Sequence, residues 1–201
     1  MRYREYAPLK DGFSTGKLNR ITDVPRLRVG HCTIDRDQPT IVRTGVTVLR
    51  IDDVISKPVW AASNVFNGYG KSIGLVQVDE LGTMESHVFF TNTLSIGAVQ
   101  QGAVKIALRE CHDITSFNAV VMECNDSYLS DIASLSVTDS MAIEAYDGAV
   151  KDFKMGSVGA GTGMVCFGFK GGIGSSSRMI EIDGREYTLG ALVLANFGRT
   201  T

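Results

Sequence analysis

Polar side chains that could bind or activate an acyl group follow two apolar segments of the chain. The acid Glu123 ends the apolar run 118–123. The amide Asn196 directly follows the apolar stretch 187–195, which is predicted to be a buried strand. A carboxylate at the end of a buried strand can be tuned by desolvation and by a partner charge. An amide in such a place can donate a hydrogen bond to an oxyanion. A solvated loop acid and a strand-ending turn residue explain Glu123 and Asn196 equally well.

Glycine-rich segments separate several of the apolar runs. The run 156–163 lacks the Lys-Ser/Thr ending of a phosphate-binding loop, and 159–164 matches a dinucleotide fingerprint only loosely. Tight loops at strand ends account for these glycines and for the cluster 171–174. An alternative is a loop whose backbone N–H groups face a substrate carbonyl. Asn67, in the segment 67–70, is either a turn residue or a polar group of the site.

A nucleophile paired with its base is missing from the sequence. The three histidines, His31, His87 and His112, lie in strand-like or helix-end contexts that favour structural roles. The sequence stops at Thr201, shortly after Asn196, where a partner strand or a helix is expected. We therefore predict that residues 1–201 form one half of an active site and that a second polypeptide carries the nucleophile.

The length and composition are those of one folded domain, or a large part of one. The chain has 201 residues, 44% of them hydrophobic, and a net charge of −2. That charge gives no electrostatic footprint for nucleic acid. The sequence has no apolar run long enough for a membrane span and no signal-peptide pattern, so a cytoplasmic location is expected. Residues 1–201 are expected to be a single domain portion, because no linker divides them.

The four cysteines are dispersed, without a CxxC pair. Free cysteine is among the most buried residue types, so Cys32, Cys111, Cys124 and Cys166 are predicted to be buried reduced thiols. A zinc site would need four converging ligands, and the spacing does not favour one.

Alternating and β-branched runs predict strands over 45–51, 118–123 and 163–170. Residues 179–189 predict a hairpin, with Asp183-Gly184 in a type I′ turn. Helical periodicity predicts helices over 96–109, with Ser95 as a possible N-cap, and over 138–146, with Thr138 as N-cap and Gly148 as C-cap. Strands and helices in mixed order indicate an α/β or α+β layered sandwich.

In order along almost the whole chain, segments of this sequence resemble the DmpA-type family of aminopeptidases, which includes the β-peptidyl aminopeptidases. The matching segments are 16–24, 29–31, 43–47, 67–70, 91–93, 158–164, 170–174 with Ser177-Arg178, and 190–198.

The resemblance implies a four-layer αββα sandwich and a precursor that cleaves itself into α and β chains. The β chain would begin with a Ser or Thr nucleophile, this chain would be the α subunit, and several αβ units would assemble. The reaction would be acyl transfer through an ester acyl-enzyme on small peptides or amides, without a metal or organic cofactor. Asn196 matches the oxyanion donor, and Glu123 matches the acid near the substrate amino group. The further residues assigned to substrate binding are Asn67, Asn125, Gly161 and Gly163.

Four positions depart from the family pattern. Asn125 stands where an aromatic residue is common, and Lys71, Gln77 and Leu94 replace other usual residues. These departures leave open a non-catalytic relative with an altered pocket. A second alternative, an acyltransferase of the ornithine acetyltransferase type, keeps the fold and changes the chemistry.

Overall fold

A four-stranded sheet forms the centre of the computed structural model, which describes residues 12–66 and 68–198. Its strands are β1 (Leu27–Arg36), β2 (Val42–Ile51), β5 (Val88–Asn92) and β6 (Val120–Cys124), in the order β1-β2-β5-β6. The pairs β1–β2 and β2–β5 are antiparallel, whereas β5 and β6 are parallel. Parallel neighbours need a crossover connection, and α3 (Ile96–Glu110) supplies it.

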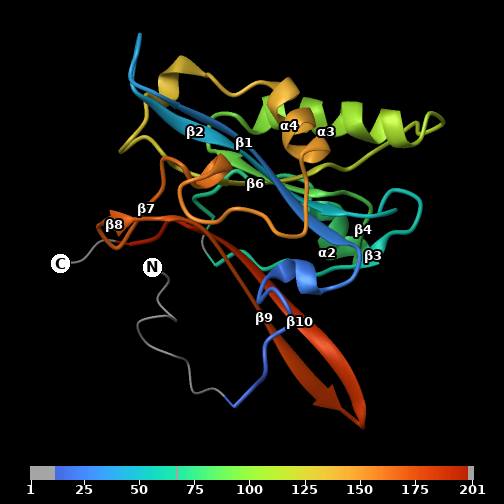
Figure 1. Ribbon diagram of the computed structural model, residues 1–201. Coiled ribbons are helices and arrows are strands. Elements are labelled where there is room, and N and C mark those ends of the chain that lie inside the picture. Colours follow the sequence, from blue (N-terminus) through green and yellow to red (C-terminus); the bar gives the residue numbers. More distant parts are fainter. Residues whose placement is uncertain (1–11, 67, 199–201) are drawn as a thin grey trace.

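Two helices cover one face of this sheet (Figure 1). Helix α3 and helix α4 (Asp139–Asp147) pack against it through a core of mostly small and β-branched residues. The helices approach each other closely at Gly102, where a Cβ atom would lie only 2.5 Å from the carbonyl oxygen of Asp139. The core members that line this layer include Val46, Val48, Phe89, Val99, Ala103, Val121 and Ala142. The predicted mixed α/β fold class is confirmed.

A long hairpin extends away from the helices (Figure 1). Strands β9 (Gly172–Ile182) and β10 (Arg185–Ala195) pair along their full length. Asp183 and Gly184 join them with φ values of 52° and 72°, as the predicted type I′ turn requires. The prediction that the last strand is buried is wrong, because β10 exposes one alternating row of side chains that includes Tyr187, Leu189 and Val193.

The other face of the hairpin packs on the body of the protein. The short helix η1 (Ile21–Asp23) lies against it, and Ile21, Val29, Phe153 and Ile173 form a second core cluster there. Within the described residues, Ser175 and Ser177 accept backbone N–H groups from Ile21 and Gly16. These bonds attach the hairpin to the N-terminal segment.

The predicted single strand over 163–170 is wrong. Residues in this range form two short strands, β7 (Val165–Cys166) and β8 (Phe169–Lys170), separated by Phe167 and Gly168, which both have positive φ. A two-residue turn therefore reverses the chain where the apolar pattern suggests continuity. Gly172 and Gly174, predicted as loop residues, lie inside β9. The remaining short elements are β3 (Val59–Trp60), α2 (Leu75–Leu81), β4 (Thr83–Met84), η2 (Ile132–Ser134) and η3 (Gly159–Gly161).

Both predicted helices are present, but their caps differ from the expected type. Ser95 and Thr138 occupy the N-cap positions of α3 and α4 without a capping hydrogen bond from the side chain. Thr138 instead contacts the Ser140 hydroxyl. Gly148 ends α4, as predicted, with φ of −81° rather than a left-handed conformation.

The four cysteines are free, and only Cys32 is buried, so the prediction of buried thiols is wrong for the three that are partly exposed. Burial still raises the pKa of Cys32 to about 12 and that of Cys124 to about 11. Such thiols are poor nucleophiles, because the thiolate is the reactive form. No helix in the described ranges is long and apolar enough to cross a membrane.

Candidate active site

The carboxyl ends of β5 and β6 form one edge of the candidate site. Because the strands are parallel and in register, Thr91 lies beside Glu123 and Asn92 beside Cys124. Beyond the strand ends, the Thr93 N–H donates to the Cys124 carbonyl at 3.0 Å. Asn92 Nδ2 donates to Thr44 Oγ1 at 2.9 Å, which ties β5 to β2. The edge is therefore held by hydrogen bonds across three strands.

Glu123 presents an almost buried carboxylate at this edge. Its side chain is 6% exposed, and Oε1 accepts the Lys71 backbone N–H at 2.9 Å. Gly70 permits this approach, since a Cβ atom there would lie 3.2 Å from the same oxygen. The Lys71 ammonium is 4.0 Å from Oε1 on a side chain that is 53% exposed. The Glu123 carboxylate therefore already has a cation nearby, on a half-exposed side chain.

Asn196 reaches the same region from β10. Its Nδ2 donates to the Asn125 carbonyl at 2.9 Å, across 71 positions of sequence. Asn125 is two residues from Glu123, so the structure brings these three predicted site residues into one region. The Asn125 side chain turns back on its own loop, where Oδ1 accepts the Ser127 N–H at 2.8 Å. An amide nitrogen has two hydrogens, so Asn196 keeps one that this bond does not use.

The two predicted site glycines are required by close packing. At Gly161, a Cβ atom would lie 2.7 Å from the Ile173 backbone nitrogen, and the Gly161 carbonyl accepts Lys170 Nζ at 2.9 Å. At Gly163, a Cβ atom would lie 2.1 Å from the Arg43 carbonyl oxygen. Contact of either glycine with a substrate stays a prediction.

Of the other predicted positions, Asn67 lies outside the described residues. Leu94 is exposed just beyond β5, where its N–H donates to Asn92 Oδ1. Gln77 lies on α2 and is half-buried.

A cleft next to the site has no counterpart in the sequence-based prediction. It has a volume of about 650 Å³, and Ser127, beside Asn125, forms part of its wall. Lys170 contributes an ammonium that bridges the carbonyls of Gly161 and Gly171 at 2.9 Å each, and burial lowers its pKa. The other lining residues include Asp35, Ile41, Arg43, Tyr128, Ser130, Asp131 and Thr162. These residues come from segments far apart in sequence, so no local sequence motif could predict the cleft.

His31 is linked through Thr47 to the backbone of η3. Its Nε2 lies 3.0 Å from the Lys154 carbonyl and therefore carries the proton, so Nδ1 accepts from Thr47 Oγ1 at 2.9 Å. Thr47 Oγ1 in turn accepts the Ala160 N–H at 3.2 Å. Burial lowers the pKa of His31, which favours the neutral imidazole that this arrangement uses. The role is structural, as its context in the sequence favoured.

The stability of the protein is therefore expected to fall with His31 protonation. The unfolded chain binds this proton near pH ~6.5, whereas the folded chain binds it only at lower pH. The contribution is present above ~6.5 and is lost as the pH falls below that value. In His31→Gln, the urea midpoint should be lower at pH ~7.5 but should decline less toward pH ~5 than in the unmodified protein. His112→Gln, at an exposed position, is the control, and parallel declines for all three proteins would contradict the assignment.

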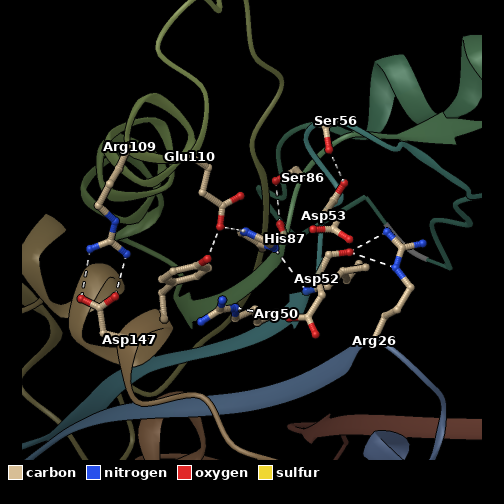
Figure 2. A network of polar contacts seen from close by, with 12 residues as sticks. Arg26, Arg50, Asp52, Asp53, Ser56, Ser86, His87, Arg109, Glu110 and Asp147 are labelled. Atoms are coloured by element: carbon tan, nitrogen blue, oxygen red, sulfur yellow. Dashed lines mark hydrogen bonds and ion pairs between the residues drawn. The ribbon is translucent and has the colours of Figure 1, made fainter.

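His87 belongs to a separate polar network at the opposite end of the sheet, because it precedes β5 whereas Glu123 lies toward the end of the parallel strand β6. Figure 2 shows Glu110 pointing toward His87, with Arg109 paired to Asp147 nearby. The His87 Nδ1 accepts the Ile51 N–H at 3.2 Å, and Nε2 lies 3.5 Å from Glu110. The interactions with His87 and with the Tyr146 hydroxyl lower the pKa of Glu110. This network joins α3, α4 and the sheet, and it does not reach the site.

Among the described residues, no group of three or more His, Cys, Asp or Glu side chains could hold a metal ion.

The sequence and the structure are both similar to aminopeptidases. A beta-peptidyl aminopeptidase, BapA, from Sphingosinicella microcystinivorans is 37% identical over 191 residues, which are 91% of this chain and 48% of BapA. The chain therefore spans about half the length of this curated relative. A BapA from Sphingosinicella xenopeptidilytica is 36% identical over 194 residues, with the same coverage of both chains.

Solved structures superpose over nearly the whole chain. The PH0078 protein from Pyrococcus horikoshii OT3 has a TM-score of 0.95 at 46% identity, covering 99% of this chain and 60% of that one. The L-aminopeptidase D-Ala-esterase/amidase from Ochrobactrum anthropi has a TM-score of 0.91 at 33% identity, covering 98% and 58%. It is described as a prototype for the serine aminopeptidases with a new variant of the Ntn hydrolase fold. The model of peptidase family S58 matches residues 19–201, and the chain belongs to this family.

Proposed function

We propose that this chain is the α subunit of an aminopeptidase that releases N-terminal residues from peptides or small amides. One observation carries the proposal: the hydrogen bond from Asn196 to the Asn125 carbonyl brings an amide donor into the region of the Glu123 carboxylate. In the proposed reaction, Glu123 binds the substrate ammonium and Asn196 donates its unused hydrogen to the oxyanion of the tetrahedral intermediate. The relatives named as aminopeptidases support the proposed activity.

The Glu123 carboxylate suits an ammonium ligand. It is nearly buried, so an ion pair formed there is screened less than one on the open surface. The Lys71 ammonium, at 4.0 Å, is exposed and can move away when a substrate amine takes its place. Lys71 would therefore compete with the substrate ammonium and weaken its binding. Glu123 would still be the group that binds this ammonium.

The nucleophile in this proposal is the N-terminal Ser or Thr of a β chain cut from the same precursor. The relatives are about twice as long as this chain, which supports a second segment of similar size. The exposed row of apolar side chains on β10 is the surface that we assign to that segment, since Tyr187, Leu189 and Val193 would gain burial there. Assembly of several αβ units is part of the same proposal.

Expression of the complete gene, followed by intact-mass measurement, tests the proposal. We expect two fragments, the second beginning with Ser or Thr, and hydrolysis of aminoacyl amides with a free amine but not of their N-acetylated forms. Glu123→Gln should raise KM for free-amine substrates about tenfold or more, because it removes a charge-assisted contact. Glu80→Gln, on the exposed side of α2, is the matched control. A single uncleaved chain that still hydrolyses these amides would overturn the proposal.

A further inference from the structure

Asp126 is a fully buried acid that neither the sequence nor the proposed mechanism explains. Its exposed fraction is 0%, and neither carboxyl oxygen has a hydrogen-bond partner among the described residues. Burying an unpaired carboxylate is costly, and native structures contain few such groups. A group of this kind so close to a candidate site calls for a functional reason.

The surroundings of Asp126 hold its side chain in place. The side chains of Thr44 and Asn92, both buried, lie near the carboxyl and lower its pKa, whereas burial raises it with the larger effect. Thr44 Oγ1 accepts from Asn92 Nδ2, so the Thr44 hydroxyl hydrogen remains available to Asp126. On the other side is Gly163, where a Cβ atom would lie 2.8 Å from the Cβ of Asp126. Asp126 is thus fixed between β2, the end of β5 and the loop after η3.

The peptide unit in front of Asp126 is the one that binds Asn196. The Asn125 carbonyl accepts Asn196 Nδ2 at 2.9 Å, and this carbonyl is bonded directly to the Asp126 nitrogen. After it, the Asp126 carbonyl accepts the Leu129 N–H at 3.1 Å and closes a turn. A shift of the Asp126 backbone, which the packed side chain restrains, would turn this peptide plane and change the direction of the Asn196 amide.

We propose that Asp126 is a positioning residue for the oxyanion donor: its carboxyl, anchored beside Thr44 and Asn92, fixes the Asn125 carbonyl and so aims the Asn196 amide. The inference rests on the proposed function, because it assigns the oxyanion contact to Asn196. It gives the buried side chain a role, since a polar group held beside Thr44 of β2 and Asn92 of β5 ties the turn to the sheet.

A double-mutant cycle in the complete, processed protein tests the inference. Asp126→Ala should lower kcat about 10- to 100-fold, because a small misplacement of a catalytic group has such an effect, with KM nearly unchanged. Asp126→Asn, which keeps the shape and one acceptor oxygen for the Thr44 hydroxyl, should restore most of kcat. When Asn196 is already alanine, Asp126→Ala should lower kcat no further, because Asp126 acts only through Asn196. Asp113→Ala, at an exposed position, is the control.

The outcomes separate this inference from the proposed function. If Asn196→Ala lowers kcat and Asp126→Ala multiplies that loss, the inference fails while the proposed function stands. If Asn196→Ala leaves kcat unchanged, both fail. Should Asp126→Ala not fold, Thr44→Val removes the hydroxyl beside the carboxyl and should show the same lack of additivity with Asn196→Ala. Full additivity for Thr44→Val would overturn the inference.

Discussion

Replacement of Asn196 by alanine in the complete protein is expected to lower kcat about 100- to 1,000-fold, the loss typical of removing one oxyanion donor. KM should change little, since the lost hydrogen bond strengthens only as negative charge develops on the substrate oxygen. The remaining structure should tolerate the change, because Asn196 follows the last residue of β10 and makes one described hydrogen bond, to Asn125.

Two further variants make this measurement specific. Asn196→Asp keeps the size of the side chain but removes the donor and adds a charge, so it should be at least as inactive as Asn196→Ala. Asn118→Ala, just before β6 and at the other end of that strand, should retain full activity. Steady-state rates on an aminoacyl amide, normalised to the amount of processed enzyme, give the comparison. Equal activity of Asn196→Ala and the unmodified enzyme would show that Asn196 has no catalytic role.

The largest expected effect on stability is that of Phe89→Ala, at about 3–5 kcal/mol. Phe89, in β5, is 1% exposed and packs in the core between the sheet and helices α3 and α4. Its removal loses the transfer free energy of the ring and leaves a cavity that the rigid sheet cannot close. Because β5 also carries Asn92 toward the site, activity should fall as the folded population falls.

Chemical unfolding of the complete protein checks this expectation. The urea midpoint of Phe89→Ala should drop with little change in slope, since slope reports the surface exposed on unfolding. Phe66→Ala deletes the same side chain at a position that is 87% exposed, and it should leave the midpoint nearly unchanged. Equal shifts in the two variants would contradict a core role for Phe89.

Local sequence patterns correctly predicted the elements whose conformation is decided by residues close together in sequence. The turn at Asp183-Gly184 needs positive φ at both residues, and α3 shows its apolar stripe in the sequence itself. The strand predicted over 163–170 failed for a related reason, because the turn at Phe167-Gly168 begins with a residue that rarely adopts positive φ. The burial of β10 was predicted wrongly because the apolar residues of a strand do not show whether another part of the protein covers them.

What the sequence determined by itself was the class of fold, the polar residues at strand ends, and the resemblance that assigned roles to Glu123 and Asn196. Only the tertiary structure decided how these groups meet: Asn196 bonds to Asn125 from 71 positions away, and Asp126 loses all exposure. Periodicity reports which face of one element is apolar, but distance and burial depend on several elements at once. Segments distant in sequence therefore set the direction of the Asn196 amide and the environment of the buried acid.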